Sequence, residues 1–106
     1  MAWMFLLIAS LLEIVWAFSM KRSAGFTRIG PTLLTFAAMV TSFGLLSLAM
    51  KSLPLGTAYP VWTGIGAVGT FVVGLAVLGE PLTIGRVTGA SLIVSGLVVM
   101  MLSTSR

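Results

Sequence analysis

The residue best suited to chemistry in this chain is Glu13, an acid inside a run that is otherwise free of charge from Met1 to Met20. An ionisable side chain near the centre of a bilayer costs on the order of 3 kcal/mol, so it persists mainly where it binds or moves something. A structural role, such as pairing with Arg22 or with the backbone of another helix, is the less favoured alternative. We therefore expect Glu13 to be functional.

Helical spacing places polar and aromatic side chains near this acid. Ser10 and Trp16 each lie three residues from Glu13 and share its face. On a later apolar run, Trp62 follows Tyr59 by three residues. The expected stripe on that run continues through Thr63 and Gly66, and a further run offers Thr41 and Ser42 near its middle. Three helices can thus present hydroxyl or aromatic groups to one acid.

Several of these residues also have ordinary explanations. Trp and Tyr commonly mark membrane interfaces, which is the favoured account of Trp3 and is as good as a site role for Tyr59. A serine inside a helix usually bonds back to its own backbone, and spacing alone favours that fate for Ser42. Trp16 is too close to Glu13 for the interface to explain it well.

The elements that must position these residues are membrane-spanning helices. The chain has 106 residues, of which 58% are apolar and 8% charged, so we expect most of it to be embedded in a lipid bilayer. Four intervals with at most one charged residue each approach the roughly 20 residues that cross a bilayer. We predict an all-α membrane protein forming a single four-helix domain, 1–106, with helices at about 2–20, 30–50, 56–78 and 85–103. The first is expected to stay in the mature protein, because no basic residue precedes it.

Charge and composition exclude several classes of function. Six basic and two acidic residues give a net charge of +4, but they separate apolar runs and form no patch, so nucleic acid is not expected as a partner. The absence of cysteine and histidine removes disulfides and the usual transition-metal ligands, and we expect no metal and no cofactor. The sequence shows no pairing of a nucleophile with a general base and no phosphate-binding loop, so we do not expect an enzyme.

The loops leave the orientation in the membrane open. Short connectors make neighbouring helices antiparallel and put both chain ends on one side. That side carries Lys51 and Arg106, and the other carries Lys21, Arg22, Arg28 and Arg86. A split of two against four biases the orientation only weakly, so insertion in both directions is possible.

Glycines indicate close helix contacts and a point of bending. Gly85, Gly89 and Gly96 share one side of the last helix, where they suit either a contact between subunits or packing within one subunit. A bundle this small has too little interior to enclose a site, so we expect an oligomer. Gly64 and Gly66 lie near the middle of the third run, where they would permit either tight packing or a bend.

A set of short motifs is distributed along the chain. They are Leu12-Glu13-Ile14-Val15-Trp16-Ala17, Lys21, Gly25-Phe26-Thr27-Arg28 with Pro31, and the run KSLPLGTAYPVWTGIGAVG from Lys51 to Gly69. In these motifs the chain resembles the small multidrug resistance transporters over essentially its whole length, and within them the guanidinium exporter subtype. Trp16 after Glu13 and the Trp62-Thr63-Gly64 sequence favour that subtype over its polyaromatic-cation relatives.

The resemblance implies a proton-coupled antiporter of the bacterial inner membrane that exports guanidinium and small substituted guanidinium cations. It implies an antiparallel homodimer with both Glu13 side chains in one site, where the carboxylate binds substrate and protons in alternation. By resemblance, Trp16 and Ser42 orient the carboxylate and Tyr59 and Trp62 line the site. The bend would lie at Gly64 and Gly66, and dimer contact at Gly89 to Gly96.

This chemistry agrees with the residues. Guanidinium is a planar cation with paired N–H donors, which a carboxylate binds through charge-assisted bonds. Aromatic faces add cation–π attraction. Protons compete for the same carboxylates, so a site that opens to one side at a time couples proton entry to cation exit.

Three positions depart from the pattern of the subtype. Ser10 stands where glycine or alanine is usual, Pro60 where alanine is usual, and Met101 where lysine is typical. These departures leave open a broader exporter of quaternary ammonium cations. One half of a heterodimeric pair is a further alternative.

Overall fold

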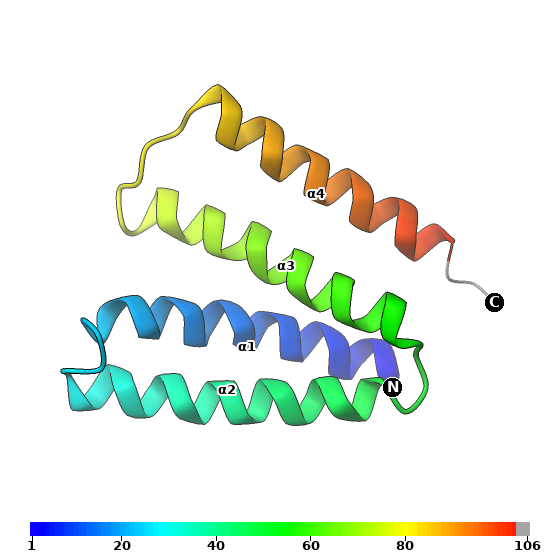
Figure 1. Ribbon diagram of the computed structural model, residues 1–106, viewed down its shortest axis with the longest axis horizontal. Helices are drawn as coiled ribbons and strands as arrows, with labels where there is room; N and C mark the ends of the chain where they lie inside the picture. The colour runs from blue at the N-terminus through cyan, green and yellow to red at the C-terminus, as the bar shows by residue number, and fades with distance from the viewer. Residues whose placement is uncertain (104–106) are drawn as a thin grey trace.

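The computed structural model describes residues 1–103, and they form four helices (Figure 1). These are α1 (Ala2–Arg22), α2 (Ile29–Ala49), α3 (Leu55–Ala76) and α4 (Ile84–Leu102). Each has 19 to 22 residues and is long and apolar enough to cross a membrane. At a rise of about 1.5 Å per residue these lengths match a hydrocarbon core of about 30 Å. The all-helical class and the four predicted spans are confirmed.

The observed helix ends differ from the predicted ones by at most two residues. The prediction ended the first helix before its first basic residue, but α1 continues through Lys21 and Arg22. Cations in a last turn interact favourably with the helix dipole, so charge did not mark the end of this helix. In the loop that follows, Ala24, Gly25 and Phe26 all have positive φ. The buried Ser23 hydroxyl holds this turn by donating to the Met20 carbonyl and accepting from the Phe26 amide.

The helices form one layer, with α1 between α2 and α3, and with α4 beyond α3 (Figure 1). The α1–α2 and α3–α4 loops lie at the same end of the molecule, and the start of α1 and the end of α4 lie near the other. The shortest dimension is only 16 Å, little more than one helix with its side chains. No second layer of helices covers this one, so any site on it is open on at least one face.

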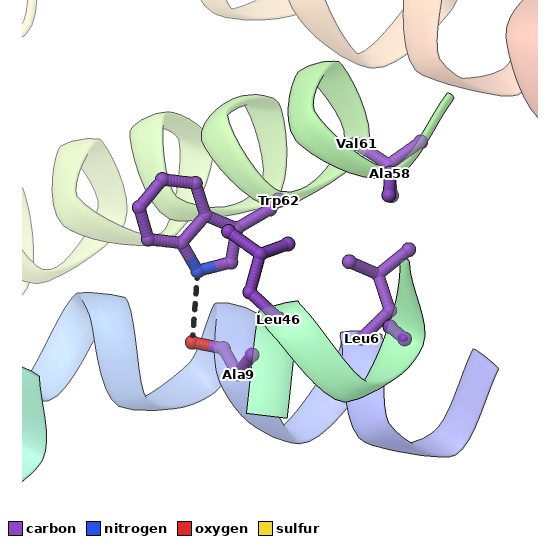
Figure 2. Close-up of a cluster of buried hydrophobic side chains, with 7 residues drawn as sticks. Leu6, Ala9, Leu46, Ala58, Val61 and Trp62 are labelled. Atoms are coloured by element: carbon purple, nitrogen blue, oxygen red, sulfur yellow. Dashed lines mark hydrogen bonds between the residues drawn. The ribbon is translucent and has the colours of Figure 1, made fainter. Parts of the chain in front are cut away.

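The core lies where α1, α2 and α3 meet near the N-terminus (Figure 2). Small residues let the backbones approach closely there, and Trp62 fills the space between the helices. The buried cluster consists of Leu6, Ala9, Leu46, Ala49, Ala58, Val61 and Trp62. By contrast, no residue of α4 is buried, and among the described helices α4 packs against α3 alone.

Candidate functional site

Glu13 lies on α1 and points its carboxyl group at the backbone of α3. A side chain at Gly66 would collide with Glu13 Oε1 and with its carboxyl carbon, so only glycine leaves room for the acid at this point. Oε1 is buried and has no hydrogen-bond partner among residues 1–103. The less favoured alternative, a pair with Arg22, is therefore not formed by this oxygen.

Trp16 carries the second unpaired polar atom. Its indole Nε1 is buried without an acceptor, and among the described residues only this atom and Glu13 Oε1 are buried polar side-chain atoms of that kind. Buried donors and acceptors are nearly always paired, because an unpaired one costs about 1–3 kcal/mol. One unpaired donor and one unpaired acceptor, a turn apart on the same helix, make this region the candidate binding site.

Ser42 and Trp62 form a hydrogen-bonded junction of three helices. The Ser42 hydroxyl on α2 donates to the Ala9 carbonyl on α1 at 2.7 Å. The Trp62 indole on α3 donates to Ser42 Oγ at 3.1 Å and to the Ala9 carbonyl at 3.3 Å, the second of which Figure 2 shows. Ala9 lies one turn before Glu13, so the junction holds the turn of α1 that carries the acid. The spacing-based expectation that Ser42 bonds to its own helix is wrong, because the small Ala9 lets α2 reach the α1 backbone.

Four aromatic rings, one of them that of Trp62 itself, form a chain of ring contacts at this junction. Phe43 meets Trp16 at 6.2 Å and Trp62 at 5.7 Å between ring centroids, edge to face in both cases. Tyr59 lies 5.6 Å from Trp62 and is half exposed. Sequence reasoning missed Phe43, because a phenylalanine in an apolar helix looks the same whether it faces lipid or a site. Its one available signal was its position directly after Ser42.

The expected stripe on α3 divides between two faces. Trp62 and Gly66 are buried and face α1, whereas Thr63 is exposed. A groove lies between α3 and α4 and has a volume of about 400 Å³. It is lined by Tyr59, Pro60, Thr63, Gly64, Ala67 and Ile93. The prediction that Thr63 continues the face of Trp62 is therefore wrong. A helix turns 100° per residue, so positions 62 and 66 share a side that position 63 leaves.

The remaining predicted residues lie around this centre. Ser10 is fully buried, and its hydroxyl donates to the Leu6 carbonyl of its own helix. α3 is continuous through Pro60, Gly64 and Gly66, and Gly64 contacts Leu97 of α4. On α4, Gly85, Gly89 and Gly96 face open space. The alternative that these three glycines pack within one subunit is wrong for this structure, since among residues 1–103 no atom of another part of the chain lies within 4 Å of a Cβ placed on any of them.

Comparison with known proteins connects this arrangement to a family. The model of the family described as Small Multidrug Resistance protein matches residues 1–93. The chain is similar to proteins named guanidinium exporter from Citrobacter freundii, with 52% identity, and from Yersinia pseudotuberculosis, with 50%. Each match covers 98% of this chain and 99% or more of the relative. The chain therefore belongs to the Small Multidrug Resistance family and is a multi-pass protein of the bacterial inner membrane.

Proposed function

We propose that this protein exports guanidinium and small substituted guanidinium cations in exchange for protons. The observation that carries the proposal is the Glu13 carboxylate, which is held against Gly66 and has a buried oxygen without a partner. The names of the relatives support guanidinium as the substrate. A planar cation with paired N–H donors is the ligand that a free carboxylate oxygen binds best.

The aromatic rings give this carboxylate a suitable surrounding. Trp16, Phe43 and Trp62 form a wall whose members meet edge to face, which leaves ring faces for a cation to lie against. The Trp62 indole N–H is already bonded within the junction. The Trp16 N–H is unbonded, and since guanidinium has no acceptor, this N–H is suited to donate to a carboxylate.

An antiparallel homodimer supplies what one chain lacks. One layer of helices cannot close a cavity over Glu13, and α4 leaves Gly89 and Gly96 uncovered on a face suited to close helix contact. A second copy in the opposite orientation would cover the open face and add its own Glu13 to the site. Protons and the cation then compete for two neighbouring carboxylates, and access from one side at a time couples their movement.

The test is guanidinium flux into liposomes that contain this chain alone. We expect uptake driven by an outward proton gradient, loss of that uptake when the gradient is collapsed, and loss in Glu13→Gln. Glu80→Gln is the matched control, since it makes the same chemical change at the other acid and should keep most of the flux at saturating guanidinium. Undiminished flux in Glu13→Gln would refute the mechanism. Absence of flux from the unmodified chain alone would instead favour a heterodimeric pair.

A broader substrate range is the second candidate, and the groove between α3 and α4 favours it. That groove holds about 400 Å³ and is mainly apolar, with Tyr59, Pro60 and Ile93 among its lining residues. An alkyl tail could lie there while the cationic head is bound at Glu13. Flux measured with methylguanidinium, tetraethylammonium and a long-chain alkyltrimethylammonium separates the candidates. Transport of the last two at rates near that of guanidinium would establish the broader exporter.

A further inference from the structure

A second cavity lies between Glu13 and the α3–α4 loop. It has a volume of about 340 Å³ and is walled by α1, α3 and that loop. At its inner end are Ala17, one turn after Glu13, and Ala67, the residue after Gly66. At its outer end are Lys21, Glu80 and Arg86. The cavity therefore runs from beside the Glu13 site to the end of the helices that carries the loops.

The outer end of this cavity already holds a guanidinium group, that of Arg86. Its Nη2 lies 3.3 Å from Glu80 Oε1, and its Nη1 donates to the Pro81 carbonyl at 2.9 Å. Its guanidinium carbon lies 5.2 Å from the centroid of the Phe71 ring. A carboxylate, a carbonyl oxygen and an aromatic face are together the groups that recognise a planar guanidinium cation.

Glu80 is positioned by the backbone and does not depend on Arg86 for its place. Its amide donates to the Gly74 carbonyl at 3.0 Å, and its carboxyl group lies directly on Gly74, where any side chain would collide with it. The side chains of Arg86 and Glu80 are 36% and 39% exposed. An ion pair this exposed is weak, so a free cation can displace the arginine while the carboxylate stays in place.

We infer that Glu80, Phe71 and the Pro81 carbonyl form a peripheral guanidinium site at the outer end of the cavity that begins one turn from Glu13. Arg86 occupies this site as a tethered competitor, and a guanidinium cation from solution replaces it before entering or after leaving the cavity. The identity of the cation rests on the proposed function. The geometry of the site rests on the contacts of Glu80 and Arg86 alone.

The direct test follows the Arg86 side chain in the unmodified full-length chain. With ¹⁵N-labelled arginine in lipid nanodiscs, the Arg86 Nε resonance is assigned by its loss in Arg86→Lys. Guanidinium should shift this resonance at about one tenth of the concentration at which sodium or tetramethylammonium does, because only guanidinium can replace its hydrogen bonds. An equal response to all three cations would mean simple screening and would overturn the proposal.

Transport kinetics give a second, independent test. Glu80→Gln should raise the half-saturating guanidinium concentration about threefold and Arg86→Gln should lower it about threefold, as expected for an exposed ion pair. Maximal flux should change little in either. A merely structural ion pair predicts instead that both variants shift this concentration in the same direction, because each breaks the same contact.

Two further variants separate the site from the general effect of charge. The double variant Glu80→Gln with Arg86→Gln has no carboxylate for which Arg86 and free guanidinium could compete. The half-saturating guanidinium concentration should therefore stay raised, as in Glu80→Gln alone. Recovery of the unmodified value would mean that only net charge matters. Lys21→Gln removes a cation from the same cavity and should leave the value unchanged. A decrease equal to that of Arg86→Gln would overturn the proposal.

The two proposals fail in different ways. If the unmodified chain carries no guanidinium flux, the proposed function fails, but the resonance of Arg86 still reports on displacement. If flux is present and depends on Glu13 while the Arg86 resonance does not distinguish the three cations, only the peripheral site fails. Repeating the resonance measurement in Glu13→Gln excludes an indirect effect of occupancy at Glu13.

Discussion

Glu13 and Glu80 are the two acids of this chain, and they meet opposite surroundings. Glu13 lies within a spanning helix, where Oε1 is buried without a partner, and Glu80 lies in a loop, where Arg86 pairs with it. Both carboxyl groups rest on a glycine of α3, Glu13 on Gly66 and Glu80 on Gly74. The same device thus positions an acid at two depths. The difference lies in the hydrogen-bond partner: Glu13 Oε1 has none among residues 1–103, whereas Glu80 is paired with Arg86.

The largest effect in this comparison is expected from Glu13→Asp. The shorter side chain keeps the charge but withdraws the carboxylate from Gly66. A misplacement of about 1 Å in a binding constellation can cost about 100-fold, and we expect a loss of guanidinium flux of that order. Glu80→Asp is the matched control and should change maximal flux less than twofold. Equal losses in the two variants would mean that depth does not distinguish the acids.

A smaller effect is expected from Gly66→Ala. The added methyl group occupies the place of the Glu13 carboxyl group, which can swing away because it is the end of a flexible side chain. We therefore expect about a tenfold loss of flux at half-saturating substrate, with little change in thermal stability, because the helix itself gains from alanine. Gly44→Ala, on a part of α2 that faces open space, should leave flux unchanged. Full activity of Gly66→Ala would show that this contact does not position the acid.

A loss of similar or smaller size is expected from Ser42→Ala. The variant removes the donor to the Ala9 carbonyl and one acceptor of the Trp62 indole, although that indole keeps the Ala9 carbonyl. We expect a destabilisation of about 1 kcal/mol and a two- to fivefold decrease in flux. Thr41→Ala is the control, because the Thr41 hydroxyl bonds only within α2. Thermal unfolding in detergent and liposome flux measure the two effects, and equal stability of both variants would contradict the role of the junction.

The smallest effect is expected from Gly74→Ala at the outer acid. The methyl group displaces the Glu80 carboxyl group, as Gly66→Ala does at Glu13, but the displaced acid remains in reach of Arg86 and solvent. The half-saturating guanidinium concentration should rise by about twofold, within the range of an exposed ion pair, and maximal flux should be unchanged. A loss of maximal flux as large as that of Gly66→Ala would place Glu80 in the central mechanism.

The parts of this protein that were predictable depend on local properties. The four spans follow from apolar length, and Glu13 stands out because charge is costly in lipid. The contacts of Ser42 were not predictable, since a serine hydroxyl can bond its own helix or a neighbouring one with similar geometry. The separation of Thr63 from Trp62 was not predicted, because helical spacing joins both residues to Tyr59 and does not say which of them meets α1. The only sequence signal for Phe43 was its position directly after Ser42, which does not say whether the ring faces lipid or a site.

By itself, the sequence determined that the chain is four apolar helices with one acid at membrane depth, because hydrophobic length and the cost of buried charge are properties of single segments. The tertiary structure decided what surrounds that acid. Small residues at Ala9 and Gly66 let α2 and α3 approach α1, which leaves Glu13 and Trp16 unpaired while Ser42 and Trp62 bond each other. The tertiary structure also places the second acid, Glu80, next to Arg86. These outcomes depend on how closely separate helices pack, which no single segment encodes.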